Sequence, residues 1–250
     1  MKFDDVRKLH QKRFREELGF FLVEGEHPVL ELQKAAVHNP QLGSCELYVT
    51  KEHADWPSPF EKHVIKSVQM SQISDTRTPQ GIVALVPMFL ASASLGGERP
   101  PGERAIYLYE IQDPGNLGTI LRTLAWFGNL RCLLSPASVE PYNSKAVRAS
   151  MGAIFHVPVE IDVELDSLRE RFARIACLDM SGESVTAPAL RDFDCYLFGN
   201  EARGLPREQL AALNSQPFTI PGSGGRAGGI ESLNLAAAVN ICVYELNRPI

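Results

Sequence analysis

The fold of the second half of this chain is decided by one stretch, AIYLYEIQDPGNLGTILRTLAWF, at residues 105–127. Its first five residues are apolar and favour a strand. Its later apolar residues recur at i, i+3, i+4 and i+7 from Leu117, as on the buried face of a helix. Pro114 and Gly115 mark the turn between them, and Arg122 lies off the apolar stripe. A strand followed directly by a helix predicts a parallel sheet covered by helices.

The same alternation of strand and helix patterns extends over the rest of the chain. After residue 127, strands are expected at 130–134, 175–178, 195–198 and 218–220, a short extended piece at 154–159, and helices at 167–174, 206–213 and 233–246. Before residue 90, a helix is expected within 2–15 and another at 27–37, with strands at 20–23, 46–49, 64–65 and 82–86.

A segment rich in glycine, proline and small residues separates the two halves. LASASLGGERPPGE at 90–103 has the composition of an interdomain linker. We therefore predict an α/β protein with a small domain at 1–88, a linker at 89–103, and a larger domain with a mainly parallel sheet at 104–250.

The charge of the chain is unevenly distributed. Overall, 25 basic residues face 30 acidic ones, and the net charge of −5 excludes a protein that coats nucleic acid without specificity. After residue 100, however, the chain holds 1 lysine and 12 arginines against 17 acidic residues. Arginine suits phosphate and carboxylate groups because its planar guanidinium donates in a fork.

The cysteines and the apolar segments indicate the environment of the protein. The five cysteines are odd in number and form no CxxC pair, so we expect buried thiols and neither a disulfide framework nor a zinc site. The N-terminus has no apolar signal segment. The longest uncharged stretch, 81–97, is interrupted by Pro87 and is too short to span a membrane. We expect a protein of the reducing cytoplasm.

Three segments that follow predicted strands carry polar residues. They read DPGNLGTILR at 113–122, FGNEARGL at 198–205 and IPGSGGRAGGIESLN at 220–234. Open α/β sheets place ligands at the carboxyl ends of their strands, where these segments would lie. Taken singly, the first also fits an ordinary turn with a surface arginine, and the second fits a simple joint between strand and helix.

The glycine-rich segment and the histidines exclude some kinds of site. Gly222, Gly224 and Ala227 match a dinucleotide-binding pattern. Such a fold also needs an acidic residue for the ribose at the end of a second strand, but only one helix follows these glycines, so we reject the match. We expect a loop that covers a ligand instead. His156 is the only histidine after residue 103, and it fits a packed position. The chemistry of the larger domain must therefore rest on Arg, Glu, Asn, Ser and backbone groups.

Together and in this order, the three segments resemble the motifs of the SpoU (TrmH) family of RNA 2'-O-ribose methyltransferases, in the SPOUT superfamily. The pattern NxGxxxR falls at Asn116, Gly118 and Arg122, FGNExxGL falls at 198–205, and IP…SLN falls at Ile220, Pro221 and 232–234. A fourth segment, NSKAVRASMGA at 143–153, is similar to the family's sequence between the first two motifs. Residues 1–88 resemble the family's substrate-binding domain, with FLVEG at 21–25 as the typical part.

This resemblance implies a fold, a reaction and an assembly. The fold would be a C-terminal SPOUT domain with a trefoil knot, preceded by a small α/β substrate-binding domain. The protein would be a homodimer with a shared site. It would transfer a methyl group from S-adenosylmethionine (AdoMet) to a ribose 2'-hydroxyl of structured RNA, with rRNA favoured over tRNA. No metal is expected.

The resemblance also implies roles for individual residues. The catalytic residues would be Arg122, Asn116, Glu201, Ser232 and Asn234. The donor would be held by Gly199, Asn200, Gly204, Ile220, Pro221 and Leu233, partly through backbone groups. Lys145 and Arg148, in the fourth segment, would bind RNA. The loop after Ile220 is longer than in compact family members, by roughly the residues 225–228.

The proton of the 2'-hydroxyl needs an acceptor, and Arg122 is a poor one because an arginine has a pKa above about 12. We expect Arg122 to orient the ribose or an adjacent phosphate, with that phosphate or Glu201 assisting deprotonation. Ser232 and Asn234 would bond Arg122 or the ribose, and Ser232 is also a candidate cap for the last helix.

A basic N-terminal helix offers a second contact with RNA. Residues 2–15 carry six basic and two acidic side chains. We assign Arg7, Lys12 and Arg13 to RNA binding on this ground. A solvated helix face explains the same residues equally well.

Three other functions are kept as alternatives. A non-catalytic RNA-binding protein would bind no AdoMet, although the intact set of catalytic residues speaks against it. A methyltransferase that modifies a base nitrogen would give a product without the alkali resistance of a 2'-O-methyl group. A nicotinamide oxidoreductase rests only on the rejected glycine pattern.

Overall fold

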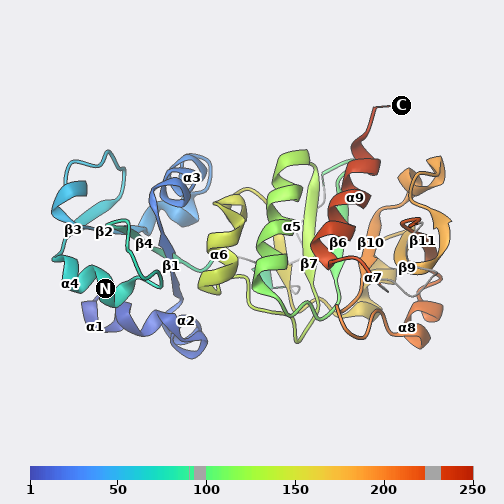
Figure 1. Ribbon diagram of the computed structural model, residues 1–250, viewed down its shortest axis with the longest axis horizontal. Coiled ribbons are helices and arrows are strands. Elements are labelled where there is room, and N and C mark those ends of the chain that lie inside the picture. Colours follow the sequence, from blue (N-terminus) through green and yellow to red (C-terminus); the bar gives the residue numbers. More distant parts are fainter. Residues whose placement is uncertain (90, 93–99, 223–231, 250) are drawn as a thin grey trace. The chain divides into compact units, whose positions relative to one another are not determined.

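The computed structural model describes residues 1–89, 91–92, 100–222 and 232–249. The chain folds into two compact units. The first comprises Met1–Phe89 and Glu140–His156, and the second comprises Leu90–Val139 and Val157–Ile250. These units differ from the contiguous domains expected above in one segment, since residues 140–156 pack with the first unit. Figure 1 shows the elements of both.

The first unit is built on a four-stranded sheet in the order β1-β4-β2-β3. β1 (Phe20–Glu24) and β2 (Glu46–Val49) flank β4 (Ile82–Pro87) as antiparallel neighbours, and β3 (Glu61–Val64) runs parallel to β2. Its described helices are α1 (Phe3–Val6), η1 (Arg7–His10), α2 (Lys12–Leu18), α3 (Glu26–Ala36), η2 (Pro40–Ser44), η3 (Lys51–His53), α4 (Ser67–Ile73), α6 (Ser144–Ser150) and η5 (Ala153–Phe155). Leu9, Met70 and Val83 are among the residues of its core.

Segment 140–156 is fixed to the first unit by polar and aromatic contacts. Arg15, 5% exposed, donates from Nε and Nη2 to the two carboxylate oxygens of Glu140 at 2.9 and 2.6 Å. The ring centroids of Tyr142 and Phe21 lie 4.6 Å apart. Losing one partner of a buried ion pair is strongly destabilising, so this segment is a structural part of the unit.

The second unit is built on a seven-stranded sheet in the order β11-β9-β10-β6-β7-β8-β5, and its six described pairs are all parallel. The strands are β5 (Ala91–Ser92), β6 (Arg104–Leu108), β7 (Leu130–Leu134), β8 (Val159–Ile161), β9 (Ile175–Ser184), β10 (Cys195–Phe198) and β11 (Gln216–Thr219). Its described helices are α5 (Pro114–Phe127), η6 (Leu165–Ser167), α7 (Leu168–Arg171), η7 (Pro188–Asp192), α8 (Arg207–Ala212) and α9 (Leu235–Asn247). The expected α/β unit with a mainly parallel sheet is confirmed.

The stretch at 105–127 forms a strand and a helix, as its pattern predicts. β7 and β10 are buried throughout, and β6 is buried after its first residue. On α5 the stripe that starts at Leu117 is buried, whereas Arg122 is exposed. Gly128 ends the helix with a φ of 68°, a conformation that favours glycine. α5 packs beside α9, the last helix of the chain (Figure 1).

The five cysteines are free and buried, as expected. Burial raises the pKa of Cys45, Cys132 and Cys242 to about 12, so these thiols are poor nucleophiles. None of the described helices is both long and apolar enough to cross a membrane.

Several local expectations are wrong. The helix expected within 2–15 is broken into α1, η1 and the start of α2. Residues 154–159 form part of η5 and only the start of β8, and the helix expected at 167–174 shortens to η6 and α7. Residues 91 and 92 of the expected linker form β5, which pairs with β8. His156 is exposed, with Nε2 at 3.0 Å from the Glu31 carboxylate, because α3 supplies a charged partner at the surface.

Candidate active site

The carboxyl ends of the parallel strands bring the polar segments to one edge of the sheet. β6 leads through residues 109–113 into α5, β10 leads into the loop 199–206, and β11 leads into Ile220 and Pro221. The ends of β6 and β10 are paired, so the first two loops start side by side. Open α/β sheets bind ligands at this edge.

The start of α5 is fixed by a side-chain cap. Asp113 Oδ1 accepts hydrogen bonds from the backbone N–H groups of Gly115 and Asn116 at 2.5 and 3.1 Å, and Pro114 occupies the first turn. An acidic cap followed by proline is a favourable helix start. The cap sets Asn116 within reach of the loop after β10.

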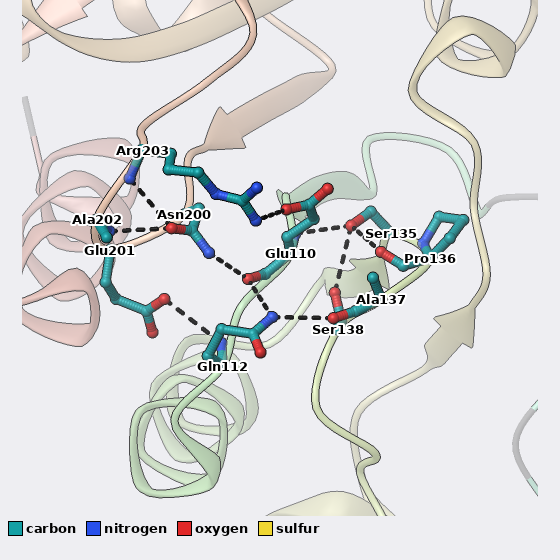
Figure 2. A network of polar contacts seen from close by, with 10 residues as sticks. All are labelled: Glu110, Gln112, Ser135, Pro136, Ala137, Ser138, Asn200, Glu201, Ala202 and Arg203. Atoms are coloured by element: carbon teal, nitrogen blue, oxygen red, sulfur yellow. Dashed lines mark hydrogen bonds and ion pairs between the residues drawn. The ribbon is translucent and has the colours of Figure 1, made fainter.

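The loop after β10 is held closed by Asn200. This residue is 6% exposed, its Oδ1 accepts from the backbone N–H groups two and three residues on, and its Nδ2 donates to the Glu110 carbonyl at 2.8 Å (Figure 2). The Asn200 and Gly204 backbones also exchange hydrogen bonds at 3.1 and 2.9 Å. A Cβ on Gly199 would lie 2.4 Å from the carbonyl carbon of Gly204, so only glycine fits there.

A chain of hydrogen bonds joins the three segments. The Ala237 N–H group, in the first turn of α9, donates to Asn234 Oδ1 at 3.2 Å, and Asn234 Nδ2 donates to Asn116 Oδ1 at 3.0 Å. Asn116 Nδ2 donates in turn to Glu201 Oε1 at 3.2 Å. The Gln112 N–H group lies 3.4 Å from the other carboxylate oxygen of Glu201.

These contacts fix the orientation of both amide groups. Reversing Asn116 would point its N–H group at that of Asn234 and its oxygen at the Glu201 carboxylate, and both contacts would be repulsive. The Glu201 side chain itself is exposed. It sits at the start of α5, where the helix dipole favours a negative charge. A carboxylate held in this way can accept a hydrogen bond or a proton from a bound hydroxyl group.

Arg122 and Ser232 stand outside this chain of contacts. Arg122 lies on the exposed face of α5, one turn before Trp126, and makes no hydrogen bond or ion pair with a described residue. Ser232 is exposed, and Asn234 rather than Ser232 caps α9, because the Asn234 side-chain oxygen Oδ1 accepts from the Ala237 N–H group in the first turn. The structure therefore brings together three of the five expected catalytic residues.

The expected donor-binding residues lie around the same edge. Gly199, Asn200 and Gly204 belong to the closed loop after β10, Ile220 and Pro221 follow β11, and Leu233 precedes α9. The Leu233 side chain is 52% exposed, which leaves an apolar surface open beside Asn234. The glycine-rich segment at 223–231, including the extra residues at 225–228, lies outside the described residues.

The expected RNA-binding residues on α6 lie in the first unit. Lys145 and Arg148 belong to this helix, and Arg148 Nη1 forms an ion pair with Asp75 at 2.6 Å. Burial opposes ionisation of Asp75, but hydrogen bonds from Arg148 and Ser144 hold its pKa below the usual value.

The N-terminal candidates for RNA binding differ in their availability. Among the described residues, Arg7 pairs with Asp4 of α1 at 3.5 Å and Lys12 pairs with Glu16 of α2 at 3.6 Å. Both pairs are exposed, and such pairs are weak. Arg13 lies 5.8 Å from the centroid of the Phe14 ring. The buried Arg15, in contrast, is occupied by Glu140 and does not add to the basic surface.

Three residues of this edge were not anticipated from the sequence. Asp113 caps α5, and an acidic residue before a proline is a signal that could have identified it. Glu110 and Gln112 join neighbouring loops, and no sequence pattern marks them. Among the residues that the structure describes, no group of three His, Cys, Asp or Glu side chains could hold a metal ion.

The tight fit of Gly199 gives a prediction about stability. Gly199→Ala should lower the free energy of unfolding of the second unit by about 2 kcal/mol, since the new methyl group would press on the Gly204 backbone. Urea titration measures this. Gly43→Ala is the control, because a Cβ there meets nothing within 4 Å. Equal stability of both variants would contradict the prediction.

Comparison with known proteins identifies two domains. The SpoU rRNA Methylase family matches residues 103–244, and the MRM3-like substrate binding domain matches residues 2–84. The 23S rRNA (guanosine(2553)-2'-O)-methyltransferase RlmP of Bacillus subtilis is 29% identical over 98% of this chain and 95% of its own length. An uncharacterized tRNA/rRNA methyltransferase of Synechocystis is 30% identical over 97% of this chain and 89% of its own length.

A solved structure resembles the whole chain. The AdoMet-bound rRNA methyltransferase from Sinorhizobium meliloti is 26% identical, with a TM-score of 0.83 over 98% of this chain and 94% of that chain. The family match covers more than half of the chain, and it includes the bonded residues Asn116, Glu201 and Asn234. The chain therefore belongs to the SpoU rRNA methylase family.

Proposed function

We propose that this chain is an enzyme that transfers a methyl group from AdoMet to a ribose 2'-hydroxyl of structured RNA. The proposal rests on the hydrogen bonds that link the side chains of Asn234, Asn116 and Glu201. They join all three motifs at the ligand-binding edge of the sheet. Ribosomal RNA is the favoured substrate, since the Bacillus subtilis relative is named for 23S rRNA and the first unit matches a substrate-binding domain.

The residues around this edge suit AdoMet, which is both bulky and cationic. The donor would be held by the loop 199–204, by Ile220 and Pro221, and by Leu233. The loop is kept in one conformation by Asn200, and the open side chain of Leu233 suits an aromatic base. When bound, AdoMet supplies a methyl group on a positively charged sulfur, and the Glu201 carboxylate gives the edge the opposite charge.

The residues of the chain align and deprotonate the acceptor. The amides of Asn116 and Asn234 hold Glu201 in one orientation, so its carboxylate can take the 2'-hydroxyl proton, alone or with a neighbouring phosphate. Arg122 stays charged at physiological pH and therefore orients the ribose or a phosphate. Methyl transfer is an in-line displacement, in which alignment supplies much of the acceleration. The proposal requires no metal ion.

The exposed apolar face of α5 and α9 supports a homodimer with a shared site. Trp126 on α5 is 85% exposed, and Ile241 and Tyr244 on α9 are 37% and 53% exposed. The two helices pack on each other. Large exposed apolar patches commonly mark protein interfaces. A second copy seated here would meet Arg122, which shares the face of Trp126, and Arg122 would complete the site of the other subunit.

Three further features belong to the proposal. The second unit has a C-terminal trefoil knot, which family membership supports. The enzyme acts in the cytoplasm, which the five free cysteines support. The first unit binds RNA through Lys145, Arg148 and the N-terminal basic residues, and the second unit carries out the methyl transfer.

The decisive test is methyl transfer by the Arg122→Ala variant. With labelled AdoMet and total RNA from a strain that lacks the gene, the wild type should form an alkali-resistant 2'-O-methyl product. The variant should transfer about 100-fold more slowly and bind AdoMet normally by calorimetry, because only alignment of the acceptor is lost. Arg169→Ala, an exposed arginine on α7, is the control. Transfer by Arg122→Ala at the wild-type rate would refute its role, and an alkali-sensitive product would indicate base methylation.

The role of the hydrogen bonds between Asn234, Asn116 and Glu201 is tested by Asn116→Asp. A carboxylate at this position would face the Glu201 carboxylate and lose the donor that orients it. We expect the kcat to fall at least about 10-fold, with unchanged AdoMet affinity. Asn129→Asp makes the same change at the opposite edge of the sheet, where Asn129 Nδ2 donates to the Gly102 carbonyl at 2.8 Å, and should keep its kcat. Equal kcat values for the two variants would contradict the assignment.

The proposed dimer is tested by Trp126→Glu. A charge on this exposed apolar face should convert the protein to a monomer in sedimentation and reduce transfer about 100-fold, since each site would lose the Arg122 of its neighbour. Val37→Glu, at a 75% exposed site in the first unit, should remain dimeric and active. A wild type that sediments as a monomer, or a monomeric Trp126→Glu variant with full activity, would argue against a shared site.

A further inference from the structure

We infer that Gln112 is a positioning residue for the transfer reaction, which holds the Glu201 carboxylate in register with Asn116. The inference rests on the proposed function. Gln112 lies outside the family motifs quoted above. It is the last residue of the loop between β6 and the Asp113 cap of α5.

The side chain of Gln112 uses both of its amide hydrogens to join two loops. Gln112 Nε2 donates to the Glu110 carbonyl at 2.8 Å, in its own loop, and to the Ala137 carbonyl at 2.9 Å, in the loop after β7 (Figure 2). The reversed amide would point its oxygen at two carbonyl oxygens, so the orientation is fixed. The backbone N–H group of the same residue approaches Glu201.

The two loops that Gln112 joins carry backbone conformations that need support. Glu110 and Ala137 have φ angles of 47° and 61°, in the left-handed region that residues other than glycine seldom adopt. Glu110 is further tied by its N–H group, which donates to Ser135 Oγ at 2.7 Å, and by an ion pair of its side chain with Arg203. Without the Gln112 amide, the Ala137 carbonyl loses the side-chain donor that links it to the β6 loop.

The contacts form a closed ring around Glu201. The Glu110 carbonyl accepts from both Gln112 Nε2 and Asn200 Nδ2, and Asn200 directly precedes Glu201 (Figure 2). The ring closes through the contact of the Gln112 N–H group with the Glu201 carboxylate. Loss of the Gln112 amide would unlink the β6 loop from the loop after β7. The Glu110 carbonyl, which also holds Asn200, could then move and shift Glu201 against Asn116. Small displacements of a reacting group can cost a large part of an enzyme's rate.

Stability and alignment can be separated at this position. Gln112 is exposed, so replacing it buries no new group and opens no core cavity. In Gln112→Met, a chain of similar length without the amide, we expect the kcat for RNA methylation to fall about 10-fold. The KM for RNA and the AdoMet affinity should stay within about twofold, and the melting temperature should barely change. A merely structural role would instead lower the melting temperature and leave kcat per folded enzyme unchanged.

Gln33→Met is the matched control, because Gln33 Nε2 also joins a carbonyl, that of Pro57 at 2.8 Å, but in the first unit. It should keep the wild-type kcat. A normal kcat in Gln112→Met, or a loss that only follows its folded fraction, would overturn the inference while leaving an active wild type as support for the proposed function. A wild type that binds no AdoMet and methylates no RNA would overturn the proposed function itself, and this role with it.

Discussion

A hydrogen bond of 3.0 Å between the side chains of Asn234 and Asn116 joins residues 118 positions apart and closes the polar edge of the second unit. Both residues also serve helix starts, since Asn234 caps α9 and Asn116 lies in the capped first turn of α5. Each needs a short side chain that donates and accepts at once, which only an asparagine provides at this length. The contact links the start of α9 to the start of α5, and Asn116 passes it on by donating to Glu201.

The arginines of the second half have two different uses. Arg131, 6% exposed, lies between the carboxylates of Glu103 and Glu160 at 2.5 and 2.6 Å, and Arg171 reaches Glu160 at 2.8 Å. These side chains serve the fold, so the count of twelve arginines overstates what is available to RNA. In the proposed enzyme, Arg122 has a different use, because it contacts the ribose or a phosphate of the RNA instead of a carboxylate of its own chain. The negative net charge of the whole protein is thus compatible with RNA binding at a local site.

Local patterns predicted those parts of the chain whose structure is decided locally. The buried stripe of α5 and the apolar strands β6, β7 and β10 follow from periodicity, since burial itself imposes the pattern. The attachment of segment 140–156 to the first unit could not be predicted, because it depends on Arg15 meeting Glu140 across 125 residues. The cap of α9 was missed for a similar reason. Ser232 and Asn234 are both good caps by type, and the helix begins directly after Asn234, whose side chain also reaches the distant Asn116.

The separation of Arg122 from Glu201 and the exposure of Trp126 follow from one constraint. A helix of 3.6 residues per turn places residues six apart about 120° from each other around its axis, so Arg122 and Asn116 cannot face the same side of α5. Trp126, four residues further on, returns to the face of Arg122. One face therefore carries a large exposed apolar ring and a guanidinium that pairs with none of the described residues. In the proposed dimer, a second subunit that covers the Trp126 ring would also contact Arg122. Assembly and catalysis would then be coupled, and a lone subunit would have an incomplete site.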